Sequence, residues 1–512
     1  MASNRNLLLN SISGFVLYFI NILTVFFITP VIVKSLGNFD YGIWELLVSV
    51  AGYMGIIDFG MGPALLQNVA VAKGTNNQIL LQKLVSTAFI FFLCLGAIVF
   101  LIFIIFYAFP KILITSEDLS VEKYRTVILL FALNTSLRFP LVALKGTIMG
   151  FQRHHFVNSV RGIYAILNAL FVYHFLQKSE YEGIIVLALL MFIMSTIQGS
   201  IYAINVKRVL NLKLFSPKFF SIIVLKDLFT YGAKSALLMT SSRLQFMSMA
   251  PIIGMSVGVE YIIFYTIPNR LLEYARGVSS ALSFPLTPYF AEIGSGEEKG
   301  SLKSKWITLA FVLQIVTFGM VVFIYFYGDK FLGLWIGREY SASMKNVLNV
   351  LIIGLMAQAL VPNSLQILLA GNKHGRIAFL YFMIACASLP ITYILGKYNG
   401  IIGSVSVSIS VTVLLSFFIL FYACKMFNFT IIDYVKNTFF KIFIPLLLLS
   451  VFVYFLTNMC AINNYVDIFV QLFLSGLIYI FLILYLSINK NVREKIIKNI
   501  FVMKKFINKN KG

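Results

Sequence analysis

Residues that build catalytic and metal sites are scarce in this 512-residue chain. It has four cysteines and four histidines, and the cysteines are far apart, with no CxxC pair and no metal-ligand spacing. Charged residues make up only 12% of the sequence. These absences argue against a disulfide framework, a metal centre and a nucleophile–histidine enzyme, so we expect no cofactor and no enzymatic activity.

Apolar runs dominate the chain instead. Hydrophobic residues account for 60% of it, and the mean hydropathy is +0.90. About 20 apolar residues cross the ~30 Å hydrocarbon core, and a helix satisfies its backbone hydrogen bonds there. The sequence predicts an all-α polytopic membrane protein with about fourteen transmembrane helices. The expected spans are 7–33, 41–66, 84–109, 124–150, 158–176, 183–205, 229–254, 259–290, 306–327, 346–370, 377–396, 400–424, 439–459 and 466–488.

Basic residues indicate how the chain is oriented. The formal net charge is +22, and Lys and Arg concentrate in the loops on the side that carries both termini. The positive-inside rule therefore places both termini in the cytoplasm, and nucleic acid is not an expected partner. The first apolar run is too long for a cleaved signal peptide. The Lys-rich tail from Lys490 either lies on the anionic inner leaflet or meets a cytoplasmic enzyme.

An internal duplication with an offset of about 221 residues divides the chain. Matched positions in the two copies are Pro30 and Pro251, Tyr41 and Tyr261, Gly74 and Gly296, Pro140 and Pro362, and Gly150 and Gly371. Six spans in each copy predict two six-helix lobes in a parallel pseudo-twofold repeat, plus two C-terminal helices. We expect an N-lobe at 1–206, a cytoplasmic linker at 207–228, a C-lobe at 229–424, spans thirteen and fourteen at 425–488, and a basic cytoplasmic tail at 489–512.

Ionisable residues inside the spans are candidates for the functional site, because a charge at membrane depth needs a partner or a wet cavity. The candidate substrate-binding cations are Arg138, Lys145, Lys234, Arg243, Arg270 and Arg276, and the candidate acids are Asp58 and Glu273. This positive surplus predicts a central cavity that attracts anions, and guanidinium groups suit phosphate oxygens. Structural roles stay open for some of them. Arg270 and Glu273 are spaced for an intrahelical pair, and Lys234 is near enough to the cytoplasmic surface to snorkel.

The opening of the chain resembles the Wzx-type polysaccharide flippases of the multidrug/oligosaccharidyl-lipid/polysaccharide exporter superfamily. The motifs that carry the resemblance are Asn10-Ser-Ile-Ser-Gly14, Phe27-Ile-Thr-Pro30, Val33-Lys-Ser-Leu-Gly37, Tyr41-Gly-Ile-Trp44 and Asp58-Phe-Gly-Met-Gly62. The span layout extends the likeness over nearly the whole chain. Many O-unit flippases are drawn with twelve spans, whereas fourteen occurs in the lipid II flippase branch.

The resemblance implies a bacterial inner-membrane protein that turns undecaprenyl-diphosphate-linked oligosaccharide, an O-antigen or related unit, to the periplasmic leaflet by alternating access. It implies that the cavity cations meet the diphosphate and that Asp58, with Glu273 as second candidate, couples transport to an ion gradient. The expected partners are this lipid-linked substrate and membrane lipids, with polysaccharide polymerase and chain-length machinery as further candidates.

Two other functions stay open. A multidrug or cation antiporter of the same superfamily would have an acidic or apolar interior, which the basic surplus disfavours. A membrane polymerase or ligase acting on lipid-linked sugars would need a large outer loop with catalytic groups, and no predicted outer loop has that size.

Overall fold

The computed structural model describes residues 4–58, 60–113, 121–178, 182–295, 300–488 and 494. All regular elements in these ranges are helices, and ten of the helices are long and apolar enough to cross a membrane. The predicted class, an all-α multi-pass membrane protein, is confirmed. The expected number of fourteen spans stays a prediction.

Two of the ten helices contain a break at a glycine. α1 (Asn4–Met54) has Gly37 at φ 69°, and α14 (Gly375–Met426) has Gly400 at φ 62°. A straight helix of 51 residues would be about 77 Å long, more than twice the ~30 Å core. Glycine adopts the left-handed conformation without a Cβ penalty. Each of these helices therefore covers two of the expected spans as two arms.

Two expected spans end earlier than the sequence predicts. In the range 41–66, α1 stops at Met54, a turn follows, and α2 (Met61–Gly74) begins after Gly60, which has φ 72°. In the range 259–290, α9 (Ile263–Ser283) ends just before Phe284 and Pro285, and α10 (Leu286–Ser295) continues the chain. A residue before proline disfavours the helical conformation. The sequence stays mostly apolar through both interruptions, so hydropathy alone does not predict them.

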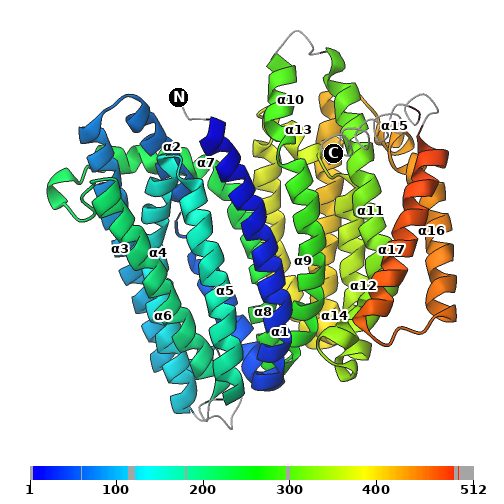
Figure 1. Cartoon of the computed structure of the whole chain (residues 1–512), viewed down its shortest axis with the longest axis horizontal. Helices are drawn as coiled ribbons and strands as arrows, with labels where there is room; N and C mark the ends of the chain where they lie inside the picture. Colours follow the sequence, from blue (N-terminus) through cyan, green and yellow to red (C-terminus); the bar gives the residue numbers. More distant parts are fainter. Residues whose placement is uncertain are drawn as a thin grey trace, which may run out of the picture. The chain divides into compact units, whose positions relative to one another are not determined.

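The first compact unit comprises Met1–Thr266 and Ala378–Ser404. Besides α1 and α2 it contains α3 (Gln78–Ala108), α4 (Val121–Gly150), α5 (His154–Lys178), α6 (Gly183–Ile204), α7 (Ile222–Met247) and α8 (Met249–Ser256). Helix α4 packs against α2, α3 and α6, and α5 packs against α1 and α6 (Figure 1). Side chains on α4 are therefore placed by neighbours on several sides.

An ionic network joins three parts of this unit at one end of α4. Lys123 Nζ lies 2.8 Å from Asp40 Oδ2 and 3.0 Å from Glu182 Oε2. The hydroxyl of Tyr124 donates to Asp40 Oδ1 at 2.7 Å. Both oxygens of Asp40 are thus engaged, so the network ties the second arm of α1 to the start of α4 and to the residue before α6.

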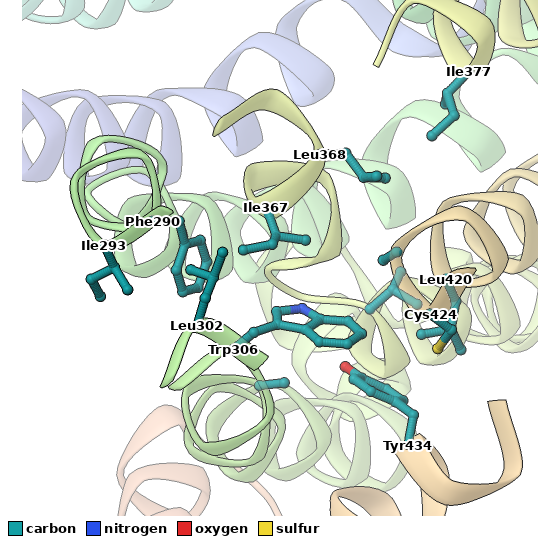
Figure 2. Packing of buried hydrophobic residues seen from close by; sticks show 13 residues of the cluster. Phe290, Ile293, Leu302, Trp306, Ile367, Leu368, Ile377, Leu420, Cys424 and Tyr434 are labelled. Carbon is teal, nitrogen blue, oxygen red and sulfur yellow. The ribbon is translucent and has the colours of Figure 1, made fainter. Parts of the chain in front are cut away.

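The second compact unit comprises Ile267–Ile377 and Val405–Gly512. Its remaining helices are α11 (Leu302–Trp335), α12 (Arg338–Leu360), α13 (Ser364–Ala370), α15 (Ile431–Asn437), α16 (Phe439–Met459) and α17 (Tyr465–Leu482). A core forms around the fully buried Trp306, which stacks on Tyr434 with ring centroids 4.9 Å apart and on Phe427 at 5.5 Å. Figure 2 shows Trp306 beside Tyr434, with Leu368 and Cys424 in the same cluster.

Helices α16 and α17 correspond to the expected last two spans. They pack against each other and against α11, and Figure 1 shows them beside it. Tyr479 donates its hydroxyl to the carbonyl of Ile315 at 2.8 Å. In lipid, where no hydrophobic force drives helices together, such close packing and hydrogen bonding hold the pair in place.

Backbone conformations recur at the spacing of the predicted duplication. Gly37 and Gly258 both have positive φ, at 69° and 137°. Gln152 and Asn372, which precede α5 and α14, have φ 60° and 53°. These pairs agree with the predicted repeat. The division into lobes, linker and appended spans stays a prediction, and the basic tail lies outside the described residues, apart from Glu494.

Candidate functional site

Helix α4 carries the first two candidate cations. Arg138 is exposed and Lys145 is half-buried, and their seven-residue spacing, nearly two turns, places them on one face. Lys145 interacts electrostatically with Arg138, with Arg161 of α5 and with Asp58. The structure therefore gathers Asp58, Arg138, Lys145 and Arg161 in the first unit, a group named here the α4 cluster.

The α4 cluster has two surplus positive charges, because it contains three cations and one carboxylate. Within the described ranges, none of the three cations forms an ion pair. The carboxylate of Asp58 accepts a hydrogen bond from the backbone N–H of Gly60 at 2.9 Å. Unneutralised cations on a membrane-spanning helix are costly unless they face water or an anion. The cluster is thus suited to attract an anion.

Asp58 occupies a different backbone setting from the one that the sequence predicts. It lies in the turn that follows α1, at residues 55–58, and not inside a transmembrane helix. Gly60, directly before α2, has φ 72°, a left-handed conformation that glycine adopts without a Cβ penalty. The carboxylate is therefore on a short irregular segment next to α4.

Arg243 of α7 reaches the same turn from another helix. Its guanidinium donates a hydrogen bond to the backbone carbonyl of Gly55. A Cβ on Gly55 would lie 2.9 Å from the Arg243 nitrogen, so a larger residue there would require the guanidinium to shift. Arg243 therefore has a backbone acceptor in addition to any role toward a ligand, and it joins α7 to the turn that carries Asp58.

Other polar side chains of α7 mostly find protein partners. Ser241 donates to the Leu237 carbonyl of its own helix at 2.7 Å, and Gln245 accepts from the Tyr381 hydroxyl at 2.7 Å. These bonds match the packing role that hydroxyls and amides often have between membrane helices. Lys234 also lies on α7, but its side chain is outside the described residues.

Helix α9 carries the remaining candidates, in the second unit. Asn269 bridges two of them: its Nδ2 donates to Glu273 Oε1 at 3.0 Å, and its Oδ1 accepts from Arg276 Nη2 at 2.8 Å. Arg270 is half-buried on the same helix, and Glu273 is exposed. The predicted Arg270–Glu273 pair stays a prediction, as does a single chamber shared with the α4 cluster.

Two residues of these groups were not among the sequence candidates. Arg161 lies near the start of the expected span 158–176 and was not singled out as a charge at membrane depth, whereas α5 begins at His154 and places Arg161 two turns into the helix. Asn269 carries no charge and so gives no signal in a search for ionisable residues. Only its position beside Arg270, on the polar side of an amphipathic helix, indicated that Asn269 belongs to the polar group.

The described residues include no group of three His, Cys, Asp or Glu side chains placed to hold a metal ion. All four cysteines are present as free thiols. The chemistry that the charged groups support is therefore recognition of an anion by cations.

Comparisons with known proteins point to one group of transporters. No protein-family model matches the chain. The sequence is 22% identical over 393 residues to a Shigella flexneri protein named "Putative O-antigen transporter", covering 75% of this chain and 89% of that protein. Among solved structures, the lipid II flippase MurJ in an inward closed conformation aligns with a TM-score of 0.71 at 12% identity, covering 93% of this chain and 97% of that one.

A multidrug resistance MATE transporter of the MOP superfamily, in an inward-facing conformation, aligns with a TM-score of 0.66 at 14% identity. The alignment covers 79% of this chain and 94% of that chain. These relatives are named transporters and flippases, in agreement with the prediction that this protein is not an enzyme. The chain thus has the fold of the MOP superfamily, the exporter superfamily that its motifs resemble, and its likeness to the Wzx-type flippases is confirmed.

Proposed function

We propose that the protein is a flippase that moves undecaprenyl-diphosphate-linked oligosaccharide, an O-antigen or related surface-polysaccharide unit, from the cytoplasmic to the periplasmic leaflet. The observation that carries this proposal is the α4 cluster, whose cations have no ion-pair partner among the described residues. The similarity to a protein named as an O-antigen transporter and the fold of a lipid II flippase support the same class of cargo.

The charge of the cluster fits this cargo. A diphosphate diester carries one negative charge on each phosphate, and the α4 cluster has two surplus positive charges. Arg138 and Arg161 offer planar donor pairs to phosphate oxygens, while Lys145 acts as a point charge. In a site of low dielectric constant these interactions are several times stronger than in water. The cargo's headgroup would therefore exchange its hydration for fixed cations.

Asp58 supplies a way to couple an ion to the cargo. A proton or a metal cation bound at its carboxylate removes the one negative charge of the α4 cluster and raises the surplus from two charges to three. The cluster then holds a diphosphate more tightly, so ion binding and cargo binding favour each other. Glu273, bridged to Arg276 by Asn269, is the second candidate for such coupling.

The remaining features of the proposal follow the sequence analysis. The protein lies in the bacterial inner membrane with both termini in the cytoplasm, and its two lobes, 1–206 and 229–424, alternate the access of the cations to the two leaflets. Polysaccharide polymerase and chain-length machinery would take over the cargo at the outer leaflet.

Transport by purified protein tests the proposal. Proteoliposomes are loaded with an undecaprenyl-diphosphate-linked fluorescent sugar, and a membrane-impermeant quencher reports how much label changes leaflet. Protein-dependent exchange is expected, and the rate should respond to an imposed ion gradient. A rate equal to that of empty liposomes contradicts the proposal.

The same preparation separates the alternatives. Uptake of cationic dyes against a gradient, with no exchange of the lipid-linked sugar, would identify a cation antiporter, which shares the MATE fold. Formation of a new glycosidic bond would identify a polymerase or ligase. Both outcomes would replace the flippase assignment.

A further inference from the structure

A cavity of about 560 Å³ opens in the second unit, where the end of α13 meets both ends of α14. Three cations line it: Lys373 precedes α14, Arg376 lies in its first turn, and Lys425 lies in its last turn. The break at Gly400 lets one long helix present its first and last turns to the same cavity. No carboxylate is among the lining residues.

These cations have no anionic partner within the part of the chain that the structure describes. None of Lys373, Arg376 and Lys425 forms an ion pair there, and all three are exposed. Three like charges around one cavity repel each other, and the repulsion is relieved only by water, salt or a bound anion.

The helix end at the cavity adds to this charge imbalance. α14 has no acidic residue in its first turn, and His374 provides no side-chain cap. The start of a helix carries partial positive charge and free N–H groups, so a cation such as Arg376 is unfavourable there, whereas an anion is favourable. The start of the helix and the cationic side chains therefore both favour a negatively charged ligand.

Apolar side chains that are packed in the core also line the cavity. Leu368 is buried in the cluster around Trp306, as Figure 2 shows, and Tyr422 and Met426 pack against that cluster while lining the cavity. The cavity lining therefore combines cations with apolar side chains that are held by the core. Its volume lies within the range of about 300–1,000 Å³ that is usual for small-molecule sites.

We propose that this cavity binds a phosphate ester, and that the ester belongs to the headgroup of an anionic phospholipid. The forked guanidinium of Arg376 and the two lysines contact the phosphate, and the glycerol and first tail carbons lie against Leu368, Tyr422 and Met426. The inference requires a membrane protein with this cavity and does not depend on the proposed transport function.

Lipid binding by the purified full-length protein tests the proposal. Native mass spectrometry follows adducts with phosphatidylglycerol and, separately, with zwitterionic phosphatidylcholine of the same chain length. The triple variant K373Q/R376Q/K425Q removes the cavity's charges. The triple variant K207Q/R208Q/K218Q removes the same number of charges from exposed residues that do not line the cavity.

We expect a phosphatidylglycerol adduct on the wild type and on the K207Q/R208Q/K218Q control, weakened at least tenfold in the cavity variant. Phosphatidylcholine should bind at least tenfold more weakly than phosphatidylglycerol. Equal phosphatidylglycerol affinity in the wild type and the cavity variant overturns the proposal, and so does an equal loss in both triple variants.

Competition with inorganic phosphate and glycerol 3-phosphate distinguishes the sources of the ester. Failure of millimolar competitor to displace phosphatidylglycerol supports the lipid. If these soluble anions bind to the protein and no lipid adduct forms, the cavity is still a phosphate site, but its ligand is soluble and not a lipid. Should the triple variant melt early, Arg376→Lys and Arg376→Gln serve instead, because only the glutamine variant removes charge. Equal lipid affinity of both single variants and the wild type would then count against the site.

Discussion

Replacing Lys145 with glutamine removes one cation of the α4 cluster and keeps a side chain of similar length. If the cluster binds a diphosphate, the variant loses one charge-assisted hydrogen bond, which is worth about 1.5–3 kcal/mol. Since about 1.4 kcal/mol is a factor of ten, the Kd for the lipid diphosphate should rise by roughly 10- to 150-fold. The direction follows from the loss of a positive charge beside the anion.

The same substitution should not destabilise the folded protein. Lys145 interacts with two cations, Arg138 and Arg161, and with one carboxylate, Asp58. Removing it relieves more repulsion than attraction, so the Tm of the empty protein should stay the same or rise slightly. A loss of binding without a loss of Tm is the signature of a ligand-binding role.

Purified protein in nanodiscs provides the assay, with undecaprenyl diphosphate as the probe and Kd measured by microscale thermophoresis. Lys83→Gln is the matched control, because Lys83 is exposed near the start of α3 and outside the α4 cluster. Lys145→Arg should retain most of the affinity. The reasoning is refuted if Lys145→Gln binds as the wild type does, or if its Tm falls by several degrees and accounts for the loss.

Two further predictions concern the stability of the fold, and a third concerns the charge balance of the α4 cluster. Gly37→Ala should lower the free energy of unfolding by about 1–3 kcal/mol because φ is 69° there. The control Gly476→Ala in α17, where a Cβ meets nothing within 4 Å, should not lower it. Equal chemical denaturation midpoints for the two variants would contradict the prediction. Arg243→Ala removes the donor to the Gly55 carbonyl and should cost about 1–3 kcal/mol in the same measurement, an unchanged midpoint being the opposing result. Asp58→Asn should strengthen the binding of undecaprenyl diphosphate several-fold and make the transport rate independent of an ion gradient. Weaker binding would argue against the assigned charge balance.

Hydropathy was sufficient to predict the fold class, because a membrane-spanning helix must be long and apolar whatever it packs against. The expected spans 439–459 and 466–488 agree closely with α16 and α17 for this reason. Where the expectation was wrong, the backbone changed direction without a change in hydropathy. The turn before α2 and the break before Pro285 both lie in apolar sequence, so hydropathy alone does not reveal them.

Candidate site residues were harder to obtain from the sequence, because charge shows which residue types are unusual but not what they touch. The seven-residue spacing of Arg138 and Lys145 placed them together correctly, since both are on one helix. Arg161 belongs to a different helix, and its place beside Lys145 depends on how α4 and α5 lie in the first unit. The backbone acceptor of Arg243 has no sequence signature, because a carbonyl is present at every residue.

The glycine breaks in α1 and α14 have a practical consequence for experiments that map transmembrane topology. At Gly37 and Gly400 one helical arm follows the other with almost no intervening loop. Proteases need an extended, accessible strand of several residues, so digestion of intact membranes would leave both sites uncut and undercount the crossings. In a variant that lacks the four native cysteines, single cysteines introduced at exposed positions beside the breaks, such as Ser35 and Asn399, would be labelled by impermeant maleimides from one side only.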